Sequence, residues 1–159
     1  MDRPPRPRDA RLLGWRRLLR AYAFLGVAEA ALSLSAFFWT YWRAGWRPGL
    51  AMAATGLLYR RATTMTLAAI VAAQVGNIFA CRTDRESVFR AGLFSNPHVW
   101  LGIGAELALL LALVLVPSLR DIFGLAPLAF AEWSVLLAFP PAMLALEEGR
   151  KWLVRKRHG

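Results

Sequence analysis

Long apolar segments separated by short charged ones dominate this sequence. The segment 62–81 has 20 residues and no charge. A helix rises about 1.5 Å per residue, so this length spans about 30 Å, the thickness of a bilayer's hydrocarbon core. Three further apolar segments of similar length lie at 21–42, 97–116 and 126–147. The pattern predicts an all-α fold, a bundle of four membrane-spanning helices.

The fourth apolar segment is the weakest of the four spans. Its uncharged part is short, and Pro140 and Pro141 interrupt it. Each proline lacks a backbone donor and frees a carbonyl one turn earlier, so this span needs neighbouring helices. We find no repeat between the two pairs of helices, which argues against an internally duplicated transporter.

The polar residues of segment 62–81 fall at helical spacing. They are Thr63, Thr66, Gln74, Asn77 and Cys81. Residues at this spacing share one face of a helix, here called the polar stripe. Side-chain amides in hydrocarbon need hydrogen-bond partners. Gln74 and Asn77 therefore predict a neighbouring helix with polar groups at the same depth.

Glu106, the one charge in the third segment, supplies such a group. At about 1.5 Å per residue, Asn77 lies about 6 Å deep, Gln74 about 10 Å and Glu106 about 13 Å. A short loop joins the two segments, so we expect them to pack side by side. The three side chains then form a candidate site of oxygen ligands for hard or alkali cations, or for protons. The sequence leaves open a structural alternative, in which the amides satisfy a helix contact and Glu106 is protonated or bonded to backbone.

The other glutamate, histidine and cysteine side chains are weaker candidates as ligands. Glu29 lies at a similar depth in the first segment, about 13 Å, but a single glutamate among alanines favours a packing role or contact with another helix. His98 and His158 have no second histidine or cysteine at ligand spacing, so we expect no transition-metal site. Cys81 is the single cysteine, which excludes an intrachain disulfide.

Composition and charge place the chain among multi-pass membrane proteins. Hydrophobic residues make up 57% of the 159 residues, and the mean hydropathy is +0.40. The net charge is +10. The basic residues lie between apolar segments rather than along a polar face, so the expected partner is the lipid bilayer and not nucleic acid.

The distribution of Lys and Arg predicts the orientation. Fifteen lie in the N-terminal segment, the loop after the second span and the C-terminal tail, against five in the other two loops. The positive-inside bias then places both termini in the cytoplasm, with the plasma membrane as the expected location. We expect a basic, proline-rich leader at 1–20 and a four-span membrane domain at 21–157.

Several stretches together resemble one known family. They are RPPRPRDARLL at 3–13, ATTMTLAAIVAAQVGNIFACRTDRESVFRAGLFSNP at 62–97, ELAL at 106–109, IFGLAPL at 122–128 and EEGRKWLVRKR at 147–157. In order and spacing they are similar to the C-terminal membrane region of P-type cation-transporting ATPases. The similarity is to the branch that contains calcium pumps and sodium/potassium pumps.

This resemblance implies that the four spans are the seventh to tenth helices of a pump. Gln74, Asn77 and Glu106 match positions that help to coordinate a transported cation in members of the family. Calcium pumps of the sarcoplasmic type have a glutamate where this chain has Gln74, and sodium/potassium pumps have an aspartate where it has Asn77. These departures leave the identity of the ion open.

The catalytic parts of that family are missing from these residues. Its phosphorylated aspartate lies in a DKTG motif, but none of the aspartates here, Asp2, Asp9, Asp84 and Asp121, precedes a lysine. No glycine-rich phosphate loop is present. We therefore expect a pump fragment that is inactive alone and holds no cofactor, with ATP and Mg²⁺ bound by the remaining helices and catalytic domains of a pump. The alternatives are a small four-helix proton-coupled transporter, using Glu29 or Glu106, and a non-transporting membrane scaffold.

Overall fold

A computed structural model describes residues 15, 19–81, 92, 94 and 96–158, and within these residues all regular structure is helical. Four helical stretches are long and apolar enough to cross a membrane: Tyr22–Arg43, Gly56–Ala80, Pro97–Leu115 and Phe130–Lys156. The predicted all-α fold with four spans is confirmed. The expected leader at 1–20 and the loop after the second span lie almost wholly outside the described residues.

The described residues form seven helical elements. They are η1 (Arg20–Gly26), α2 (Val27–Arg43), α3 (Gly56–Ala80), α5 (Pro97–Leu115), α6 (Pro117–Ile122), α7 (Phe130–Leu136) and α8 (Phe139–His158). η1 is a π-helical turn that runs directly into α2. α3 begins at Gly56, before the expected start at Ala62, so its first turns contain Arg60 and Arg61.

The fourth span consists of two helices, as its prolines predict. α7 ends at Leu136, a turn occupies 137–138, and α8 begins at Phe139. An unbroken helix would need backbone donors at Pro140 and Pro141, which proline lacks. The missing donors therefore explain why the span divides at this point.

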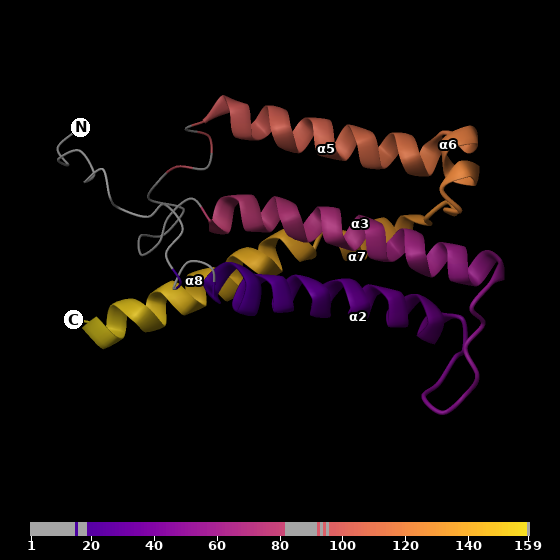
Figure 1. Cartoon of the computed structure of the whole chain (residues 1–159), viewed down its shortest axis with the longest axis horizontal. Helices are drawn as coiled ribbons and strands as arrows, with labels where there is room; N and C mark the ends of the chain where they lie inside the picture. The colour runs from indigo at the N-terminus through magenta and orange to yellow at the C-terminus, as the bar shows by residue number, and fades with distance from the viewer. Residues whose placement is uncertain (1–14, 16–18, 82–91, 93, 95, 159) are drawn as a thin grey trace.

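Figure 1 shows that α3 is the helix around which the others are arranged. α2 lies beside it, α8 crosses it, and α5 lies along another side. α5 makes its main contacts with α3 and α6 and is the least buried of the spanning helices. The described part of the bundle is thus three helices in close contact, with α5 at its edge.

α3 packs through its smallest residues. The completely buried ones include Ala62, Ala69, Ala73 and Ala80. At Gly76 a Cβ atom would lie 2.7 Å from both Met143 Cβ and the Pro140 carbonyl oxygen, so the backbone of α8 comes too close for any side chain. Small residues permit this approach between membrane helices, and they fix how α3 is rotated in the bundle.

The polar stripe of α3 is only partly covered as a result. Thr66 donates a 2.9 Å hydrogen bond to the carbonyl of Ala62 in its own helix, so its hydroxyl needs no neighbouring helix. Gln74 is exposed, and Asn77 is half-buried. Within this chain the expected contact with another helix is made by Asn77 and not by Gln74.

Candidate functional site

Polar groups from two spans meet inside the bundle at one depth. Asn77 Nδ2, near the end of α3, donates a 2.7 Å hydrogen bond to Glu29 Oε2, in the first turn of α2. The two helices are antiparallel neighbours, so the end of one lies beside the start of the other (Figure 1). A hydrogen bond to a carboxylate is among the stronger ones in proteins, and this one fixes the orientation of the Asn77 amide.

The other half of the same amide has no partner. Asn77 Oδ1 is buried and accepts no hydrogen bond from any described residue. A buried carbonyl oxygen left in this state costs about 1–3 kcal/mol. Such an atom therefore indicates a position where a water molecule or a cation would be stabilised.

Glu106 adds a second carboxylate to the same region. It is half-buried on α5, which packs against α3, the helix that carries Asn77. Two carboxylates near one another repel unless a proton or a cation is shared between them. The arrangement therefore suits a hard cation with oxygen ligands, or a proton.

The three predicted site residues have different surroundings in the structure. Asn77 is hydrogen-bonded to Glu29 and Glu106 is half-buried on α5, whereas Gln74 is exposed one turn earlier on α3. For Glu29 the sequence favours a packing role or a contact with another helix, and in the structure Glu29 contacts α3 through Asn77. The signal that identifies it is its depth, which equals that of Glu106 at about 1.5 Å per residue.

Carboxylates and thiols alone do not make a metal site here. Within the described residues no three His, Cys, Asp or Glu side chains lie together in a way that would hold a metal ion. A cation bound between Glu29 and Glu106 would therefore also need amide, backbone or water oxygens, such as Asn77 Oδ1. Calcium accepts such mixed oxygen ligands, usually 6–8 of them.

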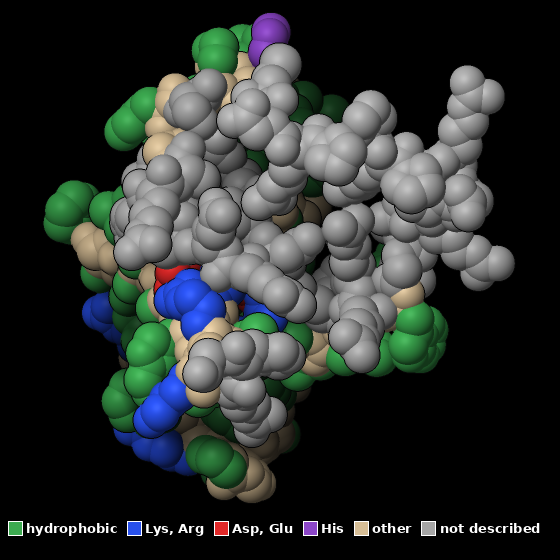
Figure 2. Space-filling model, turned by 90° about the vertical axis from the view of Figure 1, so that its left-hand side faces the viewer, with side chains coloured by type: hydrophobic (Ala, Val, Ile, Leu, Met, Phe, Trp, Pro, Cys, Tyr) green, Lys and Arg blue, Asp and Glu red, His purple; other side chains and the backbone are tan. Residues whose placement is uncertain are grey.

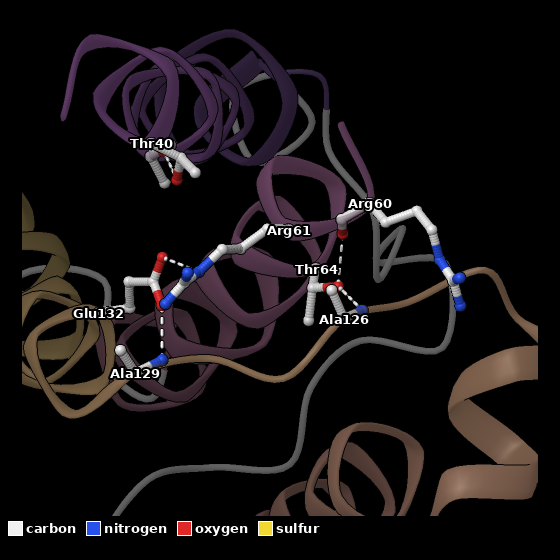
Figure 3. Close-up of polar contacts among 8 residues, drawn as sticks. Thr40, Arg60, Arg61, Thr64, Ala126, Ala129 and Glu132 are labelled. Carbon is white, nitrogen blue, oxygen red and sulfur yellow. Dashed lines mark hydrogen bonds and ion pairs between the residues drawn. The ribbon is translucent and has the colours of Figure 1, made fainter. Parts of the chain in front are cut away.

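A second polar cluster lies at the opposite end of the bundle, where α3 begins (Figure 3). Arg61 binds both oxygens of Glu132, with Nε 2.8 Å from Oε1 and Nη2 2.9 Å from Oε2. The Glu132 side chain is only 8% exposed. Its Oε2 also accepts the Ala129 amide at 2.5 Å, which closes the start of α7. The two-pronged contact joins α7 firmly to α3.

The neighbouring residues of α3 hold the segment that precedes α7. Thr64 Oγ1 donates to the Arg60 carbonyl at 2.7 Å and accepts the Ala126 amide at 2.8 Å (Figure 3). Arg60 Nη2 reaches Asp121 Oδ1 in α6 at 3.2 Å. The start of α3 therefore organises this whole end of the bundle.

The end of the bundle where α8 terminates carries a different set of charges. Arg150 pairs with Glu147 at 2.6 Å, and Lys151 pairs with Glu148 at 3.1 Å. Figure 2 looks onto this end and shows basic side chains beside an acidic one. These are the charge pairs that the sequence of α8 predicts at its polar end.

Together, four apolar spans with polar groups buried between them define a multi-pass membrane protein. The family model described as "Cation transporting ATPase, C-terminus" matches residues 1–153. The chain therefore belongs to this family, and the resemblance to P-type cation ATPases is confirmed at that level.

Individual relatives agree with the family match. The chain is 27% identical to "Calcium-transporting ATPase 1" of Yarrowia lipolytica and 29% identical to the protein of the same name in Schizosaccharomyces pombe, over 99% of its length. It is 30% identical to "Probable cation-transporting ATPase F" of Mycobacterium tuberculosis over 90% of its length. The aligned region makes up 16% of each yeast relative and 14% of the mycobacterial one.

Proposed function

We propose that this chain works as the C-terminal membrane domain of a P-type cation pump and supplies part of a cation site. The observation that carries the proposal is the buried Oδ1 of Asn77, beside Glu29, which accepts no hydrogen bond from the described residues. Glu106, half-buried on the neighbouring α5, would add a second carboxylate. These three groups offer the oxygen ligands that a hard cation needs inside a bilayer.

The four spans then correspond to the seventh to tenth helices of a pump in the calcium and sodium/potassium branch. Gln74, exposed on α3, would complete the site by facing helices of the remaining part of the pump. Two yeast relatives are named as calcium-transporting, so Ca²⁺ is the cation we propose to test first. The plasma membrane is the location that fits the predicted orientation.

The energy source lies outside these residues in this proposal. No DKTG motif occurs in the sequence, so ATP and Mg²⁺ would be bound by the catalytic domains of the pump. In the assembled pump, the chain would stabilise the transport helices. It would not itself hydrolyse ATP. The cation would bind only when both parts are present in one assembly.

The test measures ATP-dependent uptake of radioactive Ca²⁺ into membrane vesicles. Vesicles that contain the chain alone should show no uptake, and vesicles that also contain the preceding part of a cation pump should show it. In the complete assembly, Glu106→Gln and Asn77→Ala should each raise the Ca²⁺ concentration for half-maximal uptake about tenfold, equivalent to about 1.4 kcal/mol.

The matched control is Asp121→Asn, which removes a carboxylate whose side chain is 69% exposed and paired with Arg60, at the other end of α3 from Asn77. It should leave the half-maximal concentration unchanged. If neither Glu106→Gln nor Asn77→Ala shifts that concentration, the cation-site role is wrong. Uptake by the chain alone would contradict the proposed dependence on the rest of a pump.

One observation favours a second candidate function. Two spanning helices each carry a carboxylate that is partly shielded from solvent, Glu29 on α2 and Glu106 on α5, and either would hold a proton inside the bilayer, as proton-coupled transporters require. Proteoliposomes containing the chain alone should then dissipate a pH gradient, and Glu29→Gln should abolish that leak. An intact gradient with the unmodified chain would exclude this candidate.

A further inference from the structure

A cavity of about 230 Å³ opens where α2 ends and α3 and α7 begin. Its walls include Trp39, Thr40, Arg43, Leu58, Arg61 and Glu132. The first span ends at Arg43 and the fourth begins at Phe130, so the cavity lies at the level of a membrane interface. Figure 3 shows Thr40, Arg61 and Glu132 around this space, on three different helices. It is far along α3 from Asn77 and does not belong to the proposed cation site.

The charges in the cavity wall do not cancel. Glu132 is satisfied by Arg61 and by the Ala129 amide. Arg43 lies 5.0 Å above the ring of Trp39 and forms no ion pair with any carboxylate of the described residues. Two arginines and one glutamate leave the cavity with a positive charge. An anion at this position would be attracted, and a cation repelled.

Donors are available for such an anion. Glu132 engages Nε and Nη2 of Arg61, so Nη1 can donate to another group. Arg43 is exposed, with its guanidinium carbon 5.0 Å from the centre of the Trp39 ring, and it lines the same cavity. Planar guanidinium groups bind phosphate oxygens through paired hydrogen bonds.

The remaining walls are apolar. The ring of Trp39 and the side chain of Leu58 line the same cavity as the two arginines. Tryptophan is enriched at this depth because its ring lies between headgroups and acyl chains. The volume equals that of about eight water molecules at about 30 Å³ each, so a headgroup fits and a whole lipid does not.

We propose that this cavity binds the phosphate of an anionic phospholipid. Arg43 and Arg61 donate to the phosphate oxygens, and Trp39 and Leu58 contact the glycerol backbone. The acyl chains then lie along the apolar surface of the bundle. A zwitterionic lipid is disfavoured because its quaternary amine would enter a cavity that is already positive. Free phosphate shares the anionic group but gains nothing from the apolar walls.

The experiment measures lipid retention by the purified chain in detergent, using native mass spectrometry with phosphatidylglycerol or phosphatidylcholine. The chain should retain phosphatidylglycerol in preference to phosphatidylcholine. Arg43→Gln should lower that retention about tenfold. The matched control is Arg47→Gln, because Arg47 also stacks on a tryptophan, 5.5 Å above Trp42, but does not line the cavity; it should retain the lipid normally.

A second variant tests the cavity without changing a charge. Ala131→Trp places a large ring in the wall and should also reduce retention of phosphatidylglycerol, while the helical circular dichroism signal stays unchanged. Inorganic phosphate at millimolar concentration should not displace the lipid. Equal retention by Arg43→Gln and Arg47→Gln, equal retention of both lipids, or displacement by inorganic phosphate would each overturn the proposal.

Discussion

At the scale of single residues, the bundle contains two kinds of buried polar site. They differ in whether every polar atom has a hydrogen-bond partner. Asn77 Oδ1 is buried, accepts no hydrogen bond from the part of the chain that the structure describes, and lies beside the Glu29 carboxylate of α2. Glu132 of α7, which lies beside the start of α3, has hydrogen-bond partners for both of its carboxylate oxygens. The first arrangement leaves room for a ligand, whereas the second holds two helices together.

The ion pair between Arg61 and Glu132 should contribute to the free energy of unfolding. Arg61→Met would leave the Glu132 carboxylate buried and paired only with a backbone amide, which should lower the free energy of unfolding by about 3 kcal/mol. The measurement is reversible unfolding in mixed micelles, followed by circular dichroism. A loss below about 1 kcal/mol would mean that Glu132 finds another partner.

Arg60, the residue before Arg61, provides the matched control. Arg60→Met removes an ion pair whose partner, Asp121, has a side chain that is 69% exposed. Exposed pairs contribute about 0–1 kcal/mol, so this variant should unfold almost as the unmodified chain does. The contrast between adjacent arginines isolates the effect of burial.

At the scale of the element, the position of α3 depends on Gly76, a residue without a side chain. Gly76 allows the backbone of α8 to approach at Pro140 and Met143. Gly76→Ala would place a methyl group 2.7 Å from both, so the two helices would have to separate. We expect a loss of about 3 kcal/mol or more in the free energy of unfolding, at the upper end for an overpacked core.

Gly104 on α5 provides the comparison, because a Cβ there meets nothing within 4 Å. Gly104→Ala should stabilise the helix by about 0.5–1 kcal/mol through reduced backbone freedom. Unfolding in mixed micelles measures both variants. If Gly76→Ala is also neutral or stabilising, the close approach of α8 is not needed for the fold.

The helices also show which features of the fold can be predicted from the sequence alone. The number of spans follows from the length of uncharged runs, and the division of the fourth follows from two prolines, since both are local properties. The start of α3 was missed because Arg60 and Arg61 are satisfied by Asp121 and Glu132, which lie far along the chain. Local hydrophobicity contains no information about such partners.

The candidate site was predictable in part for a related reason. Spacing places Gln74 and Asn77 on one helical face, but the rotation of α3 is decided by buried alanines and Gly76. Depth places Glu29 level with Glu106, yet only the packing of α2 against α3 brings it to Asn77. Spacing therefore selects the polar side chains, but which of them pair depends on contacts between helices that spacing does not contain.

At the scale of the whole molecule, orientation is the property to test. The single cysteine, Cys81, is exposed at the end of α3, at the same end of the bundle as the close of α8 (Figure 1). The positive-inside bias predicts that this end faces the cytoplasm. A membrane-impermeant maleimide should therefore label Cys81 in inside-out vesicles and not in intact cells.

The control moves the thiol to the other side. In Cys81→Ser combined with Ala54→Cys, the cysteine lies in the exposed segment before α3 and should be labelled in intact cells. The reverse pattern for both proteins would show that the chain is inserted with its termini outside.

The broken fourth span has a mechanical consequence. Its first half is fastened to the start of α3 by Arg61 and Glu132, and its second half touches α3 near Gly76. The two halves are still joined by backbone hydrogen bonds, from the Leu137 amide to the Trp133 carbonyl and from the Ala142 amide to the Ala138 carbonyl. A force applied to the tail of α8 would therefore pass through the bend at 137–138 and reach both attachments to α3.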